Sequence, residues 1–309
     1  WHRTHSRADR DRTRQVAPSP PRRRLWPGRD PRGGPRRRRK GPRRDRNGRR
    51  GRRGGGRGAD PHDDVTVVEL GSGSSTKTPL LLDAIEPAAY VPVDISGDFL
   101  RDSAEALAAR FPGLAIYPVE ADFTQRVTMP DEIADLPKLG FFPGSTIGNM
   151  VARTAVDLLR NWRCALGEES LLLIGIDRIK DVATLELAYD DPAGVTAAFN
   201  LNLLERINRE LGGDIPVANF SHRAIWDDVH ARIEMHLVAA CDMEFTIDGR
   251  LYAMAKGETI HSENSHKYGP RDANLLLRAS GWTPLATWDD ADPAFALILA
   301  EATEFRSAP

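Results

Sequence analysis

The stretch Val67-Val68-Glu69-Leu70-Gly71-Ser72-Gly73-Ser74-Ser75-Thr76-Lys77 decides the fold class of this chain. Its apolar, β-branched start predicts a buried strand, and its glycines let the following turn pass close to a ligand, where a Cβ would collide. A second apolar run, Ala89-Tyr90-Val91-Pro92-Val93, ends at Asp94. A carboxylate there can accept hydrogen bonds from both hydroxyls of a ribose. The two runs together predict an α/β domain that binds an adenosine-containing cofactor.

The glycine loop by itself leaves two interpretations open. It lacks the third glycine of the dinucleotide fingerprint and the Gly-Lys-Ser/Thr ending of a P-loop. With Glu69 before the first glycine, it fits S-adenosylmethionine (SAM), which has no pyrophosphate to bind. The alternative is an ordinary tight turn between a strand and a helix. Asp94 lies at a suitable distance along the chain and favours the cofactor.

Charge divides the chain near residue 60. Residues 1–60 contain 23 of the 43 Lys and Arg residues but 5 of the 44 Asp and Glu residues, a net charge of +18. The remainder carries −19, so the formal net charge of −1 averages two opposite regions. Arg, Gly and Pro dominate the first region, which has too few aliphatic residues to offset its ordering entropy. We therefore expect residues 1–60 to be a disordered tail.

Three interpretations of this tail stay open. A basic tail can bind nucleic-acid phosphates through charge, or it can be a solvated extension without a role of its own. It can also be an out-of-frame translation of GC-rich DNA, because Arg, Gly and Pro all have GC-rich codons. The missing initiator Met and the absence of Glu from residues 1–60 favour this frame artefact.

The about 250 residues that follow are enough for one large α/β domain, or for a domain with an insertion. No apolar run reaches the roughly 18 residues of a membrane span, and no signal-peptide core precedes the domain. Cys164 and Cys241 show no metal or redox spacing, and we expect both to be buried thiols in a reducing compartment. We expect a monomeric, cytoplasmic protein.

Strand and helix signals alternate from residue 65 to about residue 180. This alternation requires right-handed crossovers and a parallel sheet, and ligands bind such sheets at the carboxyl ends of the strands. The prediction is a doubly wound, Rossmann-like sheet with Gly71, Asp94, Asp122 and Asn149 at one edge. The expected helices are 78–85, 98–110 and 152–166, and the expected strands are 66–70, 90–93, 114–119, one ending near residue 142, and 170–176.

Residues 181–267 break this pattern, and we expect them to form a smaller α+β insertion that binds the substrate. The cofactor-binding domain would then consist of 61–180 and 268–309. Within the insertion, Asp248-Gly249 is a strong hairpin signal. The elements expected from residue 181 onward are a helix at 197–211, antiparallel strands at 231–239, 241–247 and 250–260, a helix at 270–280 and a strand near 294–300.

Six motifs occur in order along the chain: Glu69–Lys77, Asp94, Asp122-Phe123, Phe141–Asn149, Tyr189-Asp190-Asp191 and Glu263-Asn264-Ser265. Over residues 62–306 the sequence resembles the SAM-dependent histidine Nα-methyltransferases, which begin ergothioneine synthesis by making trimethylated histidine (hercynine). The resemblance implies a SAM-dependent methyltransferase fold and this reaction. The wider family includes fungal N-methyltransferases of tryptophan-derived amines, so another amino acid or an aromatic amine stays open as the substrate.

The resemblance also implies which residues bind SAM. Gly71 and Gly73 allow close approach of its methionine part, and Asp94 holds the ribose. Asp122 accepts from the adenine amino group while Phe123 covers the ring; without the resemblance, this pair would equally indicate a polar strand end beside a core aromatic. Lys77 meets the methionine carboxylate. The expected cofactor-binding residues are Gly71, Ser72, Gly73, Lys77, Asp94, Asp122 and Phe123.

For the substrate, the resemblance implies a site for an α-amino acid. Asn149 and Tyr189 are the implied catalytic residues and donate to the carboxylate, with Asn149 near the reacting amine. Glu263 and Ser265 are two residues apart, so an extended backbone points both the same way, and they suit the two nitrogens of an imidazole. Met235 lines the same part of the site. In isolation, Asn149 would indicate a turn residue and Tyr189 a half-buried helix residue. Glu263 and Ser265 would indicate a solvated strand face, and Met235 would indicate an ordinary core residue.

The histidines show no metal-ligand pattern, so we expect no metal site and no catalytic histidine among His222, His230, His236, His261 and His266.

Family members carry a Tyr-Pro-Thr-Arg-like segment before the glycine loop, whose tyrosines help to close the site. Residues 1–60 contain no tyrosine. A different class of function therefore also stays open, namely an inactive SAM-binding domain with a nucleic-acid-binding tail.

Overall fold

The computed structural model describes residues 65–73, 77–290 and 294–303. The expectations for residues 1–60, both the disordered tail and the missing tyrosine segment, lie outside the described residues. Strands and helices alternate along the described chain up to Asp177, as the sequence predicts.

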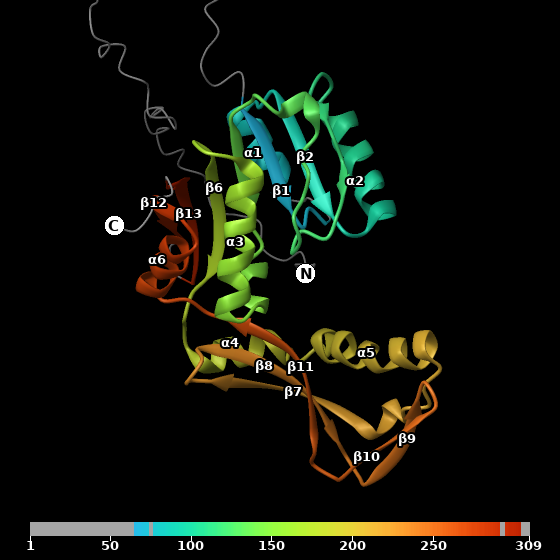
Figure 1. The fold of residues 1–309 in the computed structure, drawn as a ribbon. Coiled ribbons are helices and arrows are strands. Elements are labelled where there is room, and N and C mark those ends of the chain that lie inside the picture. Colours follow the sequence, from blue (N-terminus) through green and yellow to red (C-terminus); the bar gives the residue numbers. More distant parts are fainter. Residues whose placement is uncertain (1–64, 74–76, 291–293, 304–309) are drawn as a thin grey trace, which may run out of the picture. The chain divides into compact units, whose positions relative to one another are not determined.

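Eight strands form the central sheet of the described part: β1 (Thr66–Leu70), β2 (Ala89–Asp94), β3 (Ala115–Ile116), β4 (Val119–Glu120), β5 (Lys138–Phe142), β6 (Leu171–Asp177), β12 (Trp282–Asp289) and β13 (Phe295–Ala302). Their order is β12-β13-β6-β5-β1-β2-β3, and the short β4 also pairs with β2 (Figure 1). The strands from β1 to β6 pair in parallel, whereas β13 runs antiparallel to its two neighbours.

This strand order confirms the doubly wound α/β fold. From β1 the chain builds outward to β2 and β3, then returns to place β5 and β6 on the other side. β1 and β5 are therefore neighbours from which the chain winds in opposite directions, and such a switch point is where these sheets bind ligands. Because β1, β2, β5 and β6 are parallel, their carboxyl ends share one edge.

Four helices accompany the central sheet: α1 (Thr78–Ile85), α2 (Gly97–Arg110), α3 (Ala152–Leu166) and α6 (Pro270–Ala279). β1 and β5 are buried at every position, the pattern of parallel strands that are covered on both faces. α3 and α6 pack against each other (Figure 1). Trp282, at the start of β12, also reaches α3, because its buried indole donates a hydrogen bond to Leu159 O at 3.0 Å.

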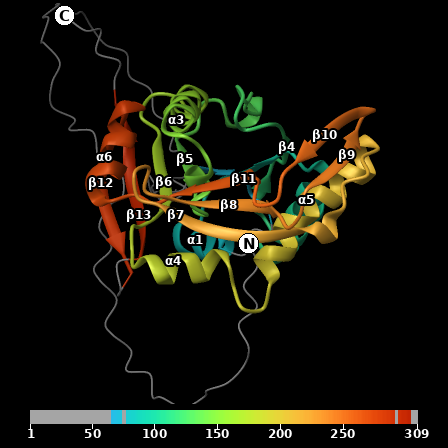
Figure 2. The same cartoon turned by 90° about the horizontal axis from the view of Figure 1, so that it is seen from below.

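The segment between β6 and α6 builds two small sheets. Its helices are α4 (Val182–Tyr189) and α5 (Val195–Leu211), with a short 3-10 turn η3 (Val217–Asn219). Its strands are β7 (Phe220–Asp227), β8 (Arg232–Ala239), β9 (Met243–Ile247), β10 (Arg250–Met254) and β11 (Thr259–His266). β7, β8 and β11 lie side by side as one antiparallel sheet (Figure 2), and β9 and β10 form the predicted hairpin. The chain leaves the central sheet at Asp177 and returns at Tyr268, whose N–H donates to Asp177 O at 3.0 Å.

Several expected elements differ from the observed ones, and helix α4 was not expected. The strand 114–119 is split into β3 and β4, because Pro118 has no N–H to donate to a neighbouring strand. The strand 250–260 is divided by a turn at residues 255–258, where Gly257 has a φ of +85°. β7 and β12 were not expected, since polar residues interrupt the alternation in β7 and Pro284 lies in β12. β12 tolerates that proline because it is an edge strand.

Both cysteines are exposed, contrary to the expectation of buried thiols. Cys164 lies on a face of α3 that does not carry its buried residues, and Cys241 lies in the turn between β8 and β9. Within the described ranges, every helix is too short or too polar to cross a membrane.

Glu69 ties three elements of the cofactor edge together from inside the fold. It is 3% exposed, and its Oε2 accepts from the Thr78 hydroxyl at 2.6 Å and from the Tyr90 hydroxyl at 2.5 Å. Thr78 begins α1, and Tyr90 lies on β2. Burial raises the pKa of Glu69 to about 7, although both hydrogen bonds act to lower it. The folded protein therefore keeps this carboxyl protonated to a higher pH than an ordinary glutamate.

Glu69→Gln should remove a pH dependence of stability. A raised pKa in the folded state means that stability is fully present below the ordinary carboxyl pKa and is lost as the pH rises through 7. Between pH 5 and pH 8, the wild type should lose roughly 2 kcal/mol relative to the Gln variant, as measured by urea unfolding. Glu105→Gln, at an exposed position of α2, is the control. A difference between wild type and Glu69→Gln that does not change with pH would contradict the raised pKa.

Candidate active site

The glycine loop after β1 is held against the end of β2. Gly71 and Gly73 have φ angles of +60° and +41°, which side chains disfavour. Gly71 N donates to Val93 O at 2.9 Å, and Gly73 N donates to Asp94 Oδ2 at 3.1 Å. Asp94 Oδ1 accepts from Ser96 N at 3.0 Å. An ionised carboxylate has about four acceptor positions, so Asp94 can also accept from ribose hydroxyls.

Phe123 lies beside the glycine loop. A Cβ on Gly71 would come within 3.3 Å of the Phe123 ring. The ring packs edge-on against Phe142 at a centroid separation of 6.1 Å, and the Phe123 carbonyl accepts from Trp162 Nε1 at 3.2 Å. Asp122 is exposed, and hydrogen bonds from the hydroxyl and then the backbone of Thr124 lower its pKa. Two motifs far apart in the sequence thus meet at the carboxyl edge of the sheet.

Ser72 and Lys77 stand at the two ends of this loop. Ser72 is buried, and its N–H lies 3.3 Å from Val93 O. Lys77 is exposed at the start of α1, with Nζ 5.8 Å from the ring centroid of Phe295. Since Phe295 begins β13, Lys77 reaches toward the antiparallel strand of the central sheet.

The loop after β5 brings Asn149 to β11. It contains a 3-10 turn, η2 (Thr146–Asn149). Asn149 Nδ2 donates to Glu263 Oε1 at 2.9 Å, and His266 Nδ1 donates to Gly148 O at 2.9 Å. A Cβ on Gly148 would lie 2.7 Å from His266 O, so glycine is needed for this approach. Burial raises the pKa of Glu263. Asn149 and Glu263, from two separate motifs, are therefore in direct contact.

Tyr189 and Ser265 are also in direct contact, with 2.6 Å between Tyr189 OH and Ser265 Oγ. Tyr189 ends α4, and its carbonyl accepts from His222 Nε2 at 2.8 Å. Lys267, which the sequence reasoning missed, donates to Tyr189 OH at 2.7 Å and to Ser265 Oγ at 2.8 Å. A signal was present, because Glu263, Ser265 and Lys267 recur at every second residue, which is the period of one strand face.

Met235 lies on the same face of the small sheet as Glu263. The two residues pair across β8 and β11, and paired residues share a face. Met235 is almost completely buried. His261 is two residues before Glu263 and would share its face in a regular strand. A β-bulge between the two residues changes the register, so His261 pairs with His236 and lies on the other face. The bulge therefore separates a site face, with Met235, Glu263 and Ser265, from a second polar face.

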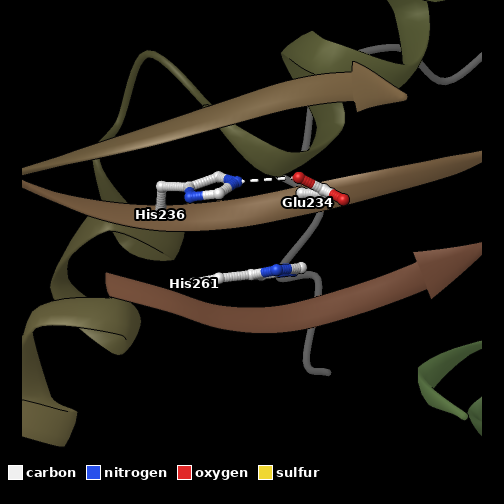
Figure 3. Close-up of side chains that lie close together, drawn as sticks. All are labelled: Glu234, His236 and His261. Atoms are coloured by element: carbon white, nitrogen blue, oxygen red, sulfur yellow. Dashed lines mark hydrogen bonds and ion pairs between the residues drawn. The ribbon is translucent and has the colours of Figure 1, made fainter. Parts of the chain in front are cut away.

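That second face carries Glu234, His236 and His261 (Figure 3). Their ligand atoms lie within 4.8 Å of one another, close enough to consider a metal ion, which the sequence did not suggest. His236 Nε2 bonds to Glu234 Oε2 at 2.9 Å, and Arg232 donates to Glu234 Oε1. The imidazoles stack at a centroid separation of 4.7 Å and an interplanar angle of 23°. Ring lone pairs in two nearly parallel planes do not converge on one ion, so we interpret this group as a hydrogen-bonded network.

Known proteins with similar sequences match most of the chain. Residues 58–302 match the family described as "Histidine-specific methyltransferase, SAM-dependent". The "Histidine N-alpha-methyltransferase" of Mycolicibacterium smegmatis is 37% identical over 248 residues, which cover 76% of this chain and 74% of that protein. The protein of the same name from Mycobacterium tuberculosis is 36% identical over 252 residues, with 76% and 74% covered. "Ergothioneine biosynthesis protein 1" of Neurospora crassa is 27% identical, over 72% of this chain and 26% of that protein. The chain belongs to the family of SAM-dependent, histidine-specific methyltransferases.

Proposed function

We propose that this protein transfers three methyl groups from SAM to the α-amine of L-histidine, giving hercynine for ergothioneine biosynthesis. The observation that carries the proposal is that Asn149 contacts Glu263 while Tyr189 contacts Ser265, both along β11. These four side chains offer polar groups to both ends of histidine. The family supports SAM as the methyl donor, and relatives named for histidine and for ergothioneine support the substrate and the pathway.

The cofactor half of the site fits SAM at the carboxyl edge of the central sheet. A Cβ on Gly71 would lie 3.3 Å from the Phe123 ring, which is a tight contact, and Asp94 keeps accepting capacity beyond its two backbone bonds. SAM supplies a methyl group on a positively charged sulfur. We assign the ribose to Asp94, the adenine to Asp122 and Phe123, and the methionine part to Gly71, Ser72, Gly73 and Lys77.

The substrate half separates the two ends of histidine. Glu263 and Ser265 share a strand face and suit the two imidazole nitrogens, while Met235 lines this end. Asn149 donates to Glu263 and so holds its carboxyl in place. We assign Asn149 and Tyr189 to the substrate carboxylate, with Asn149 near the amine.

Positioning is most of what these residues contribute to the reaction. Methyl transfer needs a neutral amine in line with the methyl–sulfur bond, and alignment of two reactants lowers the barrier without a covalent enzyme intermediate. The products of the first two transfers regain a nitrogen lone pair when they lose a proton. The third product is a quaternary ammonium that has no lone pair, so transfer stops at three.

The site residues come from both parts of the chain. Asn149 and the cofactor residues belong to 61–180, whereas Tyr189, Met235, Glu263 and Ser265 belong to 181–267. We therefore propose 181–267 as a substrate-binding insertion in a cofactor-binding domain made of 61–180 and 268–309. SAM and free histidine are both metabolites of the cytoplasm, where we propose that a monomeric enzyme acts.

A methyl-transfer assay tests the reaction and its substrate. The full chain, supplied with labelled SAM, should convert histidine to its trimethylated product, detected by mass spectrometry. Tryptophan and tryptamine are the comparison substrates. Label in either of them instead of histidine would favour the alternative of another amino acid or an aromatic amine. Bound SAM without transfer to any amine would leave only a cofactor-binding role.

Asp94→Asn should weaken SAM binding by about 10- to 100-fold, because hydrogen bonds to a charged acceptor are each worth about 1.5–3 kcal/mol. Isothermal titration with SAM measures this. Asp98→Asn, a surface carboxylate that pairs with Arg101 at the start of α2, is the matched control and should bind SAM like the wild type. Unchanged affinity in Asp94→Asn would refute the ribose assignment.

Glu263→Ala should raise the KM for histidine at least about tenfold while the Kd for SAM stays within about twofold, since a lost bond to a charged group costs about 1.5–3 kcal/mol. Steady-state kinetics and SAM titration provide the two readouts. Glu244→Ala, at an exposed position of β9, is the control. The reverse pattern, with SAM binding lost and the KM for histidine unchanged, would refute the imidazole assignment.

A further inference from the structure

Lys267 carries an almost completely buried ammonium group beside the substrate residues. Its side chain is 1% exposed, and Nζ lies 2.7 Å from Asp177 Oδ2, 2.7 Å from Tyr189 OH and 2.8 Å from Ser265 Oγ. An ammonium has three N–H donors and no acceptor, so these three oxygens account for all of its hydrogens. Both hydroxyls act as acceptors toward Lys267. Their own hydrogens therefore point away from it.

The group around Lys267 has a net positive charge. Asp177 is shared by two lysines, since Lys180 Nζ lies 2.7 Å from Oδ1 while Lys267 binds Oδ2. Two ammonium groups and one carboxylate leave one positive charge. Lys267 Nζ also lies 4.6 Å from the ring centroid of Tyr189. Positive charge is thus placed directly behind the Tyr189 hydroxyl, in a poorly solvated position where charges interact more strongly than in water.

A purely structural role does not explain this lysine. Asp177 ends β6 and Lys267 follows β11, next to the bridge between Arg178 and Tyr268, so the ion pair joins the insertion to the central sheet. An apolar pair could join them equally well, because the desolvation of a buried ion pair offsets most of its attraction. What the lysine adds is two charge-assisted hydrogen bonds to hydroxyls of the substrate site.

We propose that Lys267 is a positioning residue that makes the enzyme select substrates with a free carboxylate. It holds the hydroxyls of Tyr189 and Ser265 in place by hydrogen bonds. Its positive charge also strengthens the hydrogen bond that Tyr189 donates to the carboxylate of the substrate. The inference rests on the proposed function, in which Tyr189 binds that group. The preferred substrates are α-amino acids, ahead of amines or amides that have the same side chain.

Kinetics with two substrates test this role. Histidine and L-histidinamide share the imidazole and the α-amine, but only histidine has a carboxylate. Lys267→Met replaces the ammonium with an apolar chain of similar length. We expect kcat/KM for histidine to fall about 10- to 100-fold, mainly through KM, and kcat/KM for histidinamide to change by less than about threefold. Equal losses with both substrates, or unchanged kinetics with histidine, would overturn the proposal.

Further variants separate the lysine from its surroundings. In a Tyr189→Phe background, Lys267→Met should cause no further change in the ratio of the two kcat/KM values, because the lysine acts through the Tyr189 hydroxyl. Fully additive effects of the two substitutions would contradict this. Lys256→Met, at an exposed position in the turn between β10 and β11, is the control and should leave the ratio of the two kcat/KM values unchanged. If Lys267→Met does not fold, Lys267→Gln keeps two donors without the charge and should show the same loss of preference for the carboxylate.

Failure of the proposed function would give a different result. If the wild type methylates another amino acid and not histidine, the proposed function is wrong. A comparison of that amino acid with its amide then still tests the role of Lys267. If the wild type methylates amines equally well with and without a carboxylate, the role of Lys267 is wrong even where histidine is a substrate.

Discussion

The backbone of Gly148 lies against the backbone of His266, and the proposed substrate half of the site depends on this contact. The two residues are 118 positions apart, and His266 Nδ1 donates to the Gly148 carbonyl. A side chain on Gly148 would overlap His266 O, so the approach requires glycine. Through this contact the turn η2, which follows β5, reaches β11, and Asn149 reaches Glu263. This contact, together with the ion pair between Asp177 and Lys267, joins the insertion to the central sheet.

Three carboxyl groups near the carboxyl ends of strands of the central sheet have different roles because their surroundings differ. Burial raises the pKa of Glu69, and its hydrogen bonds with two hydroxyls tie β1 to α1 and β2. Asp94 is partly exposed and accepts backbone hydrogen bonds, so it can hold a neutral polar ligand. Asp177 lies between two ammonium groups. Residue type alone does not distinguish these roles; burial and the charge of the neighbours do.

The sequence predicted best those elements whose signal is local. The helix 152–166 and the strand 66–70 were predicted at their observed bounds, because each has a clear apolar period and a turn residue next to it. β7 and β12 were not predicted, since β7 mixes polar and apolar residues and β12 contains a proline that an edge strand tolerates. Lys267 was missed for a related reason: a lysine that follows a strand ordinarily indicates a solvated chain end, and only the folded structure buries it.

By itself, the sequence determined the α/β class, the glycine loop with Asp94, and the shared direction of Glu263 and Ser265, because backbone conformation and strand period act over a few residues. The tertiary structure decided the rest. It placed Tyr189 on Ser265 across 76 residues, shifted His261 to the opposite face from Glu263 with a β-bulge, and enclosed the ammonium of Lys267 between Asp177 and two hydroxyls. Burial and hydrogen-bond partners depend on residues that are distant in the chain, so local sequence cannot specify them.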